Sequence, residues 1–202
     1  MARDDAHTRV AGLLLAAGGG RRLGGRPKAL LTHEGRPLVE HAVRALREGG
    51  CTPVLVVLGA ARDEVRERAE LAGCVLIDNP EWAEGMGTSL RAGLERAATS
   101  EGAGAVLVSL VDQPGIGPRA VARVRAAYRS PATLAAASYG GRRGHPVLFG
   151  RQHWAEVARG ARGDAGARGY LAASAGQLTL VECGDVADPA DIDTPEDLTR
   201  LR

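Results

Sequence analysis

The residues best suited to chemistry lie in a glycine-rich stretch near the start of the chain, LLLAAGGGRRLGGRPKALL, from Leu13 to Leu31. Glycines let backbone N–H groups approach an anion closely, and arginines supply forked donors for phosphate oxygens. The stretch also holds Lys28, the one lysine among 26 basic residues. Because an ammonium is a compact charge on a thin stem, it fits between phosphates where a planar guanidinium does not. The stretch therefore predicts a phosphate-binding loop.

Neither of two familiar phosphate-loop motifs fits this stretch. A P-loop requires glycine directly before its lysine, whereas Lys28 follows Pro27. A dinucleotide-binding fingerprint that begins with Gly18 and Gly20 requires a third glycine where Leu23 stands. The alternative to a phosphate-binding loop is a flexible surface loop whose glycines and arginines reflect the base composition of the genome.

Carboxylates follow at two later places. Asp112 ends the apolar run AVLVSLV, and Asp191 and Asp193 lie in DPADIDTPEDL. A Mg²⁺ ion bound with phosphates prefers one or two carboxylates together with phosphate oxygens and water. Asp112 could instead be a turn residue that accepts from its own backbone. Much of the later acidity suits the start of a helix at Thr194, but Asp191 and Asp193 precede that start and are not needed to cap it.

The elements that must position these residues alternate between strands and helices. We expect strands at 10–15, 53–58, 74–77, 105–111, 134–139, 146–149 and 178–182. We expect helices at 37–47, 62–71, 87–98, 118–128, 152–158, 165–173 and 195–201, and loops at 140–144 and 160–169. Continuous apolar strands predict an α/β protein with three α/β/α layers and a mostly parallel sheet. Ligands bind beyond the carboxyl ends of such strands, where the first loop and Asp112 should meet.

Composition bounds the possible partners and the organisation of the chain. A net charge of +2 and 3% aromatic residues disfavour nucleic acid. No apolar run approaches the ~20 residues needed to cross a bilayer, so no membrane partner is expected. Three distant cysteines without a CxxC pair favour a reducing cytoplasm and argue against a cysteine-built zinc site. We expect a disordered tail at 1–9 and a single domain at 10–202.

The first loop also resembles a family signature. LAAGGGRRLGGRPK is similar to the LAAG-x-S/G-x-R-M/L-G-x-x-x-K motif of MobA-like nucleotidyltransferases, most closely the molybdenum cofactor cytidylyltransferase branch. The resemblance implies a Rossmann-like nucleotidyltransferase fold of the GT-A type, in which this loop wraps a triphosphate. It implies catalytic contacts from Arg22, Lys28 and Asp112, and a backbone cradle formed by Ala16, Ala17, Gly18 and Gly20. The LAAG form favours CTP over GTP.

Two further motifs carry the resemblance into the nucleotide and metal sites. DQP implies that Asp112 holds Mg²⁺, and DIDTPED implies Asp193 as the second ligand with Asp191 in reserve. DNPEWAEGMGTSL is similar to a segment that borders the nucleoside, which implies nucleotide contacts from Asn79, Gly87 and Ser89. From the residues alone, capping of the following helix by Thr88 or Ser89 accounts for this segment equally well.

The motifs GHP and GDAGAR resemble the acceptor side of the same family. They imply an acceptor pocket for a pterin phosphate, lined by Arg142, Arg143, His145 and Arg168. A lone histidine such as His145 is more often structural than catalytic. The resemblance runs in one order through about residues 10–200.

The resemblance implies a Mg²⁺-dependent enzyme that moves CMP from CTP to a phosphate-bearing acceptor, molybdopterin or the molybdenum cofactor, and releases pyrophosphate. Within the family, the donor could be GTP or the acceptor another phosphate. Some relatives carry oxidoreductase names, so an NAD(P)-dependent oxidoreductase is a rival enzyme class. A non-catalytic chaperone that delivers the cofactor to a molybdoenzyme is the rival binding protein.

Overall fold

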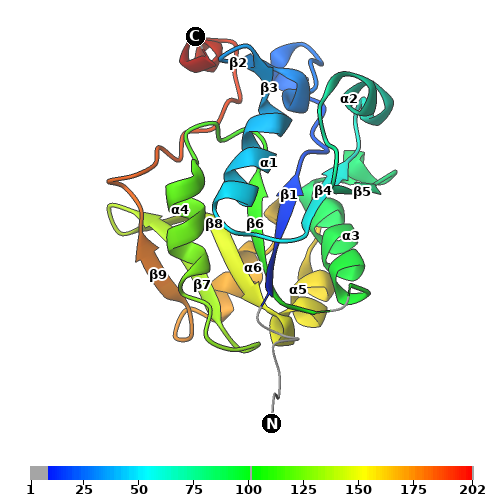
Figure 1. The fold of residues 1–202 in the computed structure, drawn as a ribbon. Helices are drawn as coiled ribbons and strands as arrows, with labels where there is room; N and C mark the ends of the chain where they lie inside the picture. Colours follow the sequence, from blue (N-terminus) through cyan, green and yellow to red (C-terminus); the bar gives the residue numbers. More distant parts are fainter. Residues whose placement is uncertain (1–8, 101, 202) are drawn as a thin grey trace.

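The computed structural model describes residues 9–100 and 102–201. In this part of the chain seven strands form one sheet in the order β5-β4-β1-β6-β8-β7-β9 (Figure 1). Their bounds are β1 Arg9–Leu15, β4 Val54–Leu58, β5 Val75–Asp78, β6 Ala103–Leu110, β7 Leu134–Tyr139, β8 Arg142–Gly150 and β9 Thr179–Glu182. Two short strands, β2 Thr32–His33 and β3 Arg36–Pro37, pair separately. Of the predicted tail, residues 1–8 lie outside the described residues, whereas Arg9 pairs with Ala103 and belongs to β1.

The sheet is mostly parallel, as predicted. Strand β1 pairs in parallel with both β4 and β6, and β7 pairs in parallel with β9. Among the described strands of this sheet only β8 runs against the others, because it pairs antiparallel with both β6 and β7. The carboxyl ends of β1 and β6 therefore meet at one edge, where the first loop and Asp112 begin.

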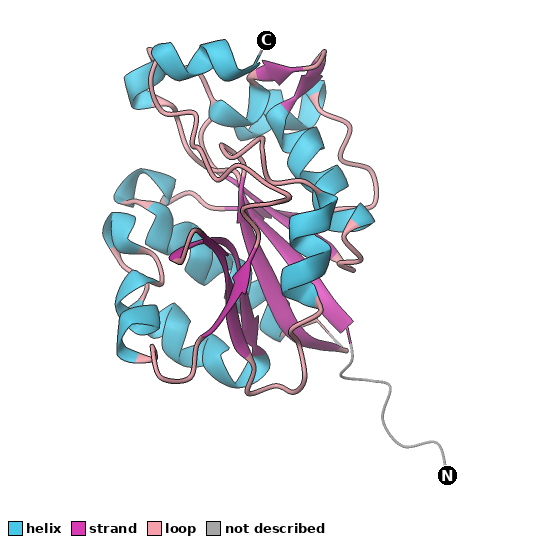
Figure 2. Cartoon of the chain, turned by 90° about the vertical axis from the view of Figure 1, so that its left-hand side faces the viewer, coloured by secondary structure: helices cyan, strands magenta, loops and turns pink. Residues whose placement is uncertain are grey.

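Helices cover both faces of the sheet (Figure 2). Their bounds are α1 Leu38–Glu48, α2 Arg62–Arg68, α3 Met86–Ala98, α4 Pro118–Arg125, α5 Trp154–Gly160 and α6 Arg168–Ala173. Short 3-10 helices cover Arg21–Leu23, Lys28–Leu30, Trp82–Glu84, Arg151–His153, Gly163–Ala165 and Glu196–Leu201. Alternate side chains of β1 divide between two buried clusters, Leu14 packing with α1 and α4 and Leu13 with α3 and α5. The fold is thus the predicted three-layer α/β/α arrangement, and no described helix has the length and apolar character to span a bilayer.

Several predicted boundaries were wrong for local reasons. Residues 142–144 were expected in a loop, but they begin β8 because Gly140 and Gly141 alone form the turn, with φ of +59° and +79°. Such a two-glycine turn is a hairpin signal. The helix expected from residue 152 begins at Trp154, and the expected final helix is a 3-10 helix over Glu196–Leu201.

Candidate active site

The loop after β1 closes on itself around Gly20. The carbonyl of Gly20 accepts hydrogen bonds from the N–H groups of Leu23 at 2.8 Å and Gly25 at 3.0 Å. Gly20 has a φ of +60°, and a Cβ there would lie 2.0 Å from the carbonyl oxygen of Arg26. Only glycine therefore fits this turn, which leads the chain back toward the sheet edge at Lys28.

The first two residues of the loop, Ala16 and Ala17, are bonded to neighbouring backbone, and the next residue, Gly18, is exposed to solvent. Ala16 and Ala17 are buried, and Ala16 donates to the carbonyl of Val57 at 3.0 Å while the carbonyl of Ala17 accepts from Ala60 at 3.0 Å. Gly18 is exposed, and no atom lies within 4 Å of the position of an added Cβ. The two alanines anchor the loop, and Gly18 offers the accessible backbone.

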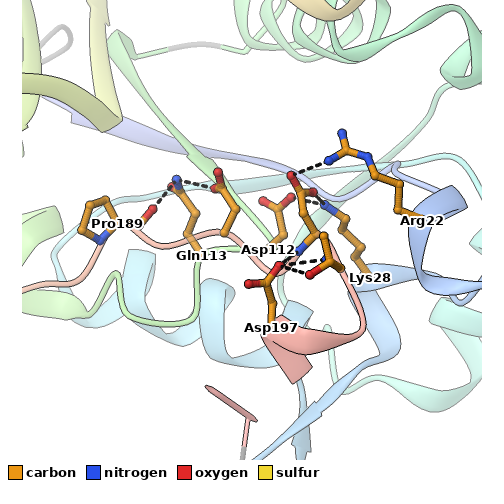
Figure 3. A network of polar contacts seen from close by, with 9 residues as sticks. Arg22, Lys28, Asp112, Gln113, Pro189 and Asp197 are labelled. Atoms are coloured by element: carbon orange, nitrogen blue, oxygen red, sulfur yellow. Dashed lines mark hydrogen bonds and ion pairs between the residues drawn. The ribbon is translucent and has the colours of Figure 1, made fainter. Parts of the chain in front are cut away.

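Lys28 and two aspartates form the centre of the site (Figure 3). The Lys28 ammonium donates to Asp112 Oδ2 at 2.6 Å and also to Asp193 Oδ1. Arg22 Nη1 donates to Asp193 Oδ2 at 3.2 Å. The side chains of Lys28 and Asp112 are only 14% and 19% exposed, whereas Arg22 is 73% exposed. Residues far apart in the chain thus meet at the carboxyl edge of β1 and β6.

The charges in this cluster determine the protonation of Lys28. Burial opposes the charged ammonium, but the charges of Asp112 and Asp193 and the hydrogen bonds to them outweigh it and raise the pKa of Lys28 above its ordinary 10.5. Lys28 is therefore a cation at neutral pH, held between two carboxylates.

The donor set at this point fits a hydrated divalent cation bound with phosphates. In the described chain no group of three or more histidine, cysteine or carboxylate side chains is gathered closely enough to chelate a metal. Two carboxylates that already share one cationic group, Asp112 and Asp193, nevertheless match the one or two that Mg²⁺ requires beside phosphate oxygens and water.

The carboxylates of Asp191 and Asp193 have different partners. The carboxylate of Asp193 contacts Lys28 and Arg22, while Asp191 Oδ1 accepts from Gln113 Nε2 at 2.8 Å. Partial burial and the charge of Asp112 raise the pKa of Asp191, and the hydrogen bond from Gln113 opposes this rise. Asp197 fixes the backbone of the segment by accepting from the N–H of Asp193 at 3.0 Å. Sequence reasoning missed Gln113, whose only signal was its position directly after Asp112.

Two of the three nucleotide-pocket candidates beyond the first loop, Asn79 and Ser89, lie in a buried polar network with Thr88. Asn79 Nδ2 donates to Thr88 Oγ1 at 2.9 Å and to Ser89 Oγ at 3.0 Å, and all three residues are less than 5% exposed. The N–H of Glu81 donates to Asn79 Oδ1 at 3.0 Å. A Cβ on Gly87 would lie 2.6 Å from the backbone nitrogen of Arg162. In the structure these residues join β5, α3 and the loop after α5.

The alternative explanation of this segment, that Thr88 or Ser89 caps α3, was wrong. Both residues lie inside the helix, which begins at Met86 after the N-cap Gly85, and no side chain caps it. The hydroxyl of Thr88 instead donates to the carbonyls of Glu81 and Gly85, each at 3.0 Å. Glycine takes the N-cap because the backbone there has a φ of +117° and lies against Gly163.

Three of the four acceptor candidates line one cavity of about 210 Å³. Arg143, His145 and Arg168 contribute to its wall, whereas Arg142 does not. The other lining residues are mostly apolar, and sequence reasoning missed them: Leu15, Met86, Leu90, Val108, Gly144, Val147, Phe149, Ala165, Gly166, Ala167 and Leu171. Burial lowers the pKa of His145 to about 4, although the charge of Asp112 opposes the shift, so His145 is neutral at neutral pH.

Two curated proteins are similar to this chain over nearly its whole length. A nicotine blue oxidoreductase from Paenarthrobacter nicotinovorans is 41% identical in an alignment of 199 positions that covers 95% of this chain and 96% of that protein. A molybdenum cofactor guanylyltransferase from Rhodobacter capsulatus is 32% identical in an alignment of 205 positions that covers 95% of this chain and 94% of that protein.

A solved structure and a family model are also similar to this chain. The crystal structure of Rv0371C in complex with manganese, from Mycobacterium tuberculosis H37Rv, superposes with a TM-score of 0.77 at 26% identity, covering 96% of this chain and 97% of that one. The MobA-like NTP transferase domain matches residues 12–178. With the glycine loop and Asp112 at the carboxyl edge of a mostly parallel sheet, this chain belongs to the MobA-like NTP transferase family.

Proposed function

We propose that the protein transfers CMP from CTP to a phosphate-bearing acceptor of the molybdopterin type, with Mg²⁺ as its cofactor. The observation that carries this proposal is the Lys28 ammonium between Asp112 and Asp193, at the end of a loop that exposes Gly18. Cationic groups, exposed backbone N–H groups and two carboxylates at one sheet edge suit a nucleoside triphosphate and its cation.

The chain's own residues supply alignment and charge. An oxygen of the acceptor phosphate forms a bond to the α-phosphorus of the nucleotide, and the bond from that phosphorus to the bridging oxygen breaks, releasing pyrophosphate. The attacking oxygen is already anionic, so no general base is needed. Lys28 and Arg22 bind the triphosphate and stabilise the charge that develops on the leaving pyrophosphate.

Asp112 and Asp193 are the residues that would hold the cation. Bound there, Mg²⁺ would neutralise charge on the phosphate oxygens. Asp112 is fixed at the end of β6 because its carbonyl accepts from the N–H of Ile192 at 2.8 Å. The same backbone bond holds the neighbouring Asp193 near Asp112. Support for a divalent cation also comes from the similar Rv0371C, which was solved with manganese.

The cavity beside His145 suits the acceptor. Its wall includes the apolar side chains of Met86, Val147 and Phe149 and the exposed arginines Arg143 and Arg168. Such a lining fits a small flat body that carries a phosphate, because the body desolvates against the apolar wall while a guanidinium binds the phosphate. A pterin phosphate has this character.

The alternatives to this proposal differ from it in the nucleotide base of the donor or in the class of reaction. The Ala16–Ala17 form of the loop favours CTP, whereas the 32% identical relative is named a guanylyltransferase. The 41% identical relative is named an oxidoreductase, which makes hydride transfer from a nicotinamide cofactor the second candidate function. Leu23, at the place of the third glycine of a dinucleotide fingerprint, counts against this candidate.

The test is transfer activity with defined substrates. Purified protein is incubated with Mg²⁺, molybdopterin and either CTP or GTP, and pyrophosphate release and the nucleotide-linked product are measured. We expect release with CTP above that with GTP. Release with GTP alone would reverse the donor assignment. Oxidation of NAD(P)H by nicotine blue, without pyrophosphate release, would replace the proposal with the oxidoreductase function, and tight molybdopterin binding without turnover would indicate a chaperone.

A further inference from the structure

The end of β6 and the segment that carries Asp191 and Asp193 are held together by several contacts. The N–H of Ile192 donates to the carbonyl of Asp112 at 2.8 Å, and Ile192 is completely buried. The N–H of Asp188 donates to the carbonyl of Gly115 at 3.3 Å, and a Cβ on Gly115 would lie 2.5 Å from the carbonyl oxygen of Asp188. The two backbones therefore lie in close contact beside the carboxylate cluster.

The side chain of Gln113 bridges these two backbones (Figure 3). Its Nε2 donates to the carbonyl of Pro189 at 3.2 Å and to Asp191 Oδ1 at 2.8 Å. The opposite amide orientation would direct an oxygen at two acceptors, so the partners fix the orientation. The Oε1 atom of Gln113 is buried, and it accepts no hydrogen bond from the described residues.

An amide suits this position. It supplies two donors to the segment without adding a positive charge. A lysine or arginine at this position would compete with a cation for the carboxylates of Asp112 and Asp193. The neutral amide of Gln113 therefore holds the segment that carries Asp191 and Asp193, and it leaves the charge of the carboxylates unchanged.

We propose that Gln113 is a positioning residue that holds Asp191, and through it Asp193, opposite Asp112 and thereby sets the cation affinity of the site. Gln113 touches none of the reacting groups, and its effect passes through the segment that it holds. The proposal concerns the cation site within the proposed function. Neighbours that orient metal ligands change metal affinity by about 10- to 100-fold when they are substituted.

The experiment compares Mn²⁺ binding, measured by electron paramagnetic resonance on purified protein with Mn²⁺ alone, among four proteins. They are the wild type, Gln113→Met, Gln113→Glu and the control Gln177→Leu, which alters an exposed glutamine. Methionine keeps the length of the side chain and removes its donors. Glutamate fills the same volume, adds a negative charge and has no N–H to donate.

We expect Gln113→Met and Gln113→Glu to bind Mn²⁺ about tenfold or more weakly, and Gln177→Leu to match the wild type. Raising the cation concentration should restore the kcat of Gln113→Met, because positioning alters affinity and not the reacting groups. Unchanged binding by Gln113→Met, tighter binding by Gln113→Glu, or no Mn²⁺ binding by the wild type would each overturn the proposal. Wild-type Mn²⁺ binding with no pyrophosphate release from any nucleotide and acceptor would remove the proposed function and leave this role standing.

Discussion

Replacing Lys28 with methionine should destabilise the protein and, at the same time, strengthen its binding of divalent cations. The ammonium bonds to Asp112 and Asp193, and the exposed fractions of the three side chains are 14%, 19% and 36%. Breaking a fully buried ion pair by removing one partner costs about 3–5 kcal/mol. Because solvent reaches all three groups and screens the remaining carboxylates, we expect a loss of about 1–3 kcal/mol in the free energy of unfolding.

The same substitution should make stability depend on metal. With the ammonium gone, Mn²⁺ or Mg²⁺ can neutralise both carboxylates, and a ligand at 100 times its Kd stabilises the folded state by about 2.7 kcal/mol. Turnover should fall by about 10²–10³-fold, because an interaction with the leaving pyrophosphate is lost. The pKa of Lys28 is raised, so its ion pairs stabilise the fold below the ordinary 10.5 and lose this effect as the pH rises through the raised value.

The assay is urea unfolding of wild type, Lys28→Met and Arg22→Met, with and without Mn²⁺, followed by steady-state kinetics. Arg22→Met is the matched control, because it removes a positive charge from the same cluster but its side chain is 73% exposed. We expect its stability to change by less than about 1 kcal/mol. Equal stability of Lys28→Met and wild type without metal, together with equal Mn²⁺ affinity, would refute the reasoning that Lys28 neutralises these carboxylates. An unchanged kcat would remove Lys28 from the mechanism.

Three further substitutions test other parts of the site. Gly87→Ala should lower the free energy of unfolding by about 1–3 kcal/mol in urea, since its Cβ would meet the backbone of Arg162 at 2.6 Å; an unchanged midpoint would contradict this packing. Asp197→Ala should lower Tm at neutral pH, and this difference should shrink as the pH falls below about 3.8. Hydrogen bonds from the N–H groups of Thr194 and Asp193 and from the Thr194 hydroxyl lower the pKa of Asp197. Its carboxylate therefore stabilises the fold above its ordinary pKa, and this stabilisation is lost as the pH falls through the lowered pKa. A difference in Tm that does not change with pH would contradict this role. Arg168→Ala should raise the acceptor KM about tenfold or more and leave the nucleotide KM unchanged, whereas equal changes in both would place Arg168 elsewhere.

The arrangement of the main elements could be predicted because each rests on a short-range pattern. The continuous apolar run before Asp112 predicts a buried parallel strand, and parallel strands end at one edge. The first loop leaves β1 at that same edge, so its meeting with Asp112 followed from topology alone. Lysine at position 28, in a chain that otherwise uses arginine, then indicated which loop residue to examine.

The side-chain partnerships could not be predicted, because they depend on packing between distant segments. Lys28 is separated from Asp193 by 165 positions, and nothing local indicates that one ammonium bonds both carboxylates. The sequence likewise contains no sign that the Asn79 amide donates to Thr88 and Ser89 inside the fold. The direction of β8 also escaped prediction, because a short apolar run does not specify whether a strand is parallel or antiparallel.

From the ion pairs of Lys28 we expect the nucleotide and the cation of the proposed function to assist each other's binding. In the structure the positive charges of Lys28 and Arg22 are paired with Asp112 and Asp193, so neither the cationic nor the anionic half of the site is free. Phosphates that draw the ammonium toward themselves release the carboxylates for a divalent cation. A cation that binds the carboxylates releases the ammonium for the phosphates. Since coupling is reciprocal, each ligand must change the other's Kd by the same factor, and Lys28→Met should diminish that factor because the shared group is gone.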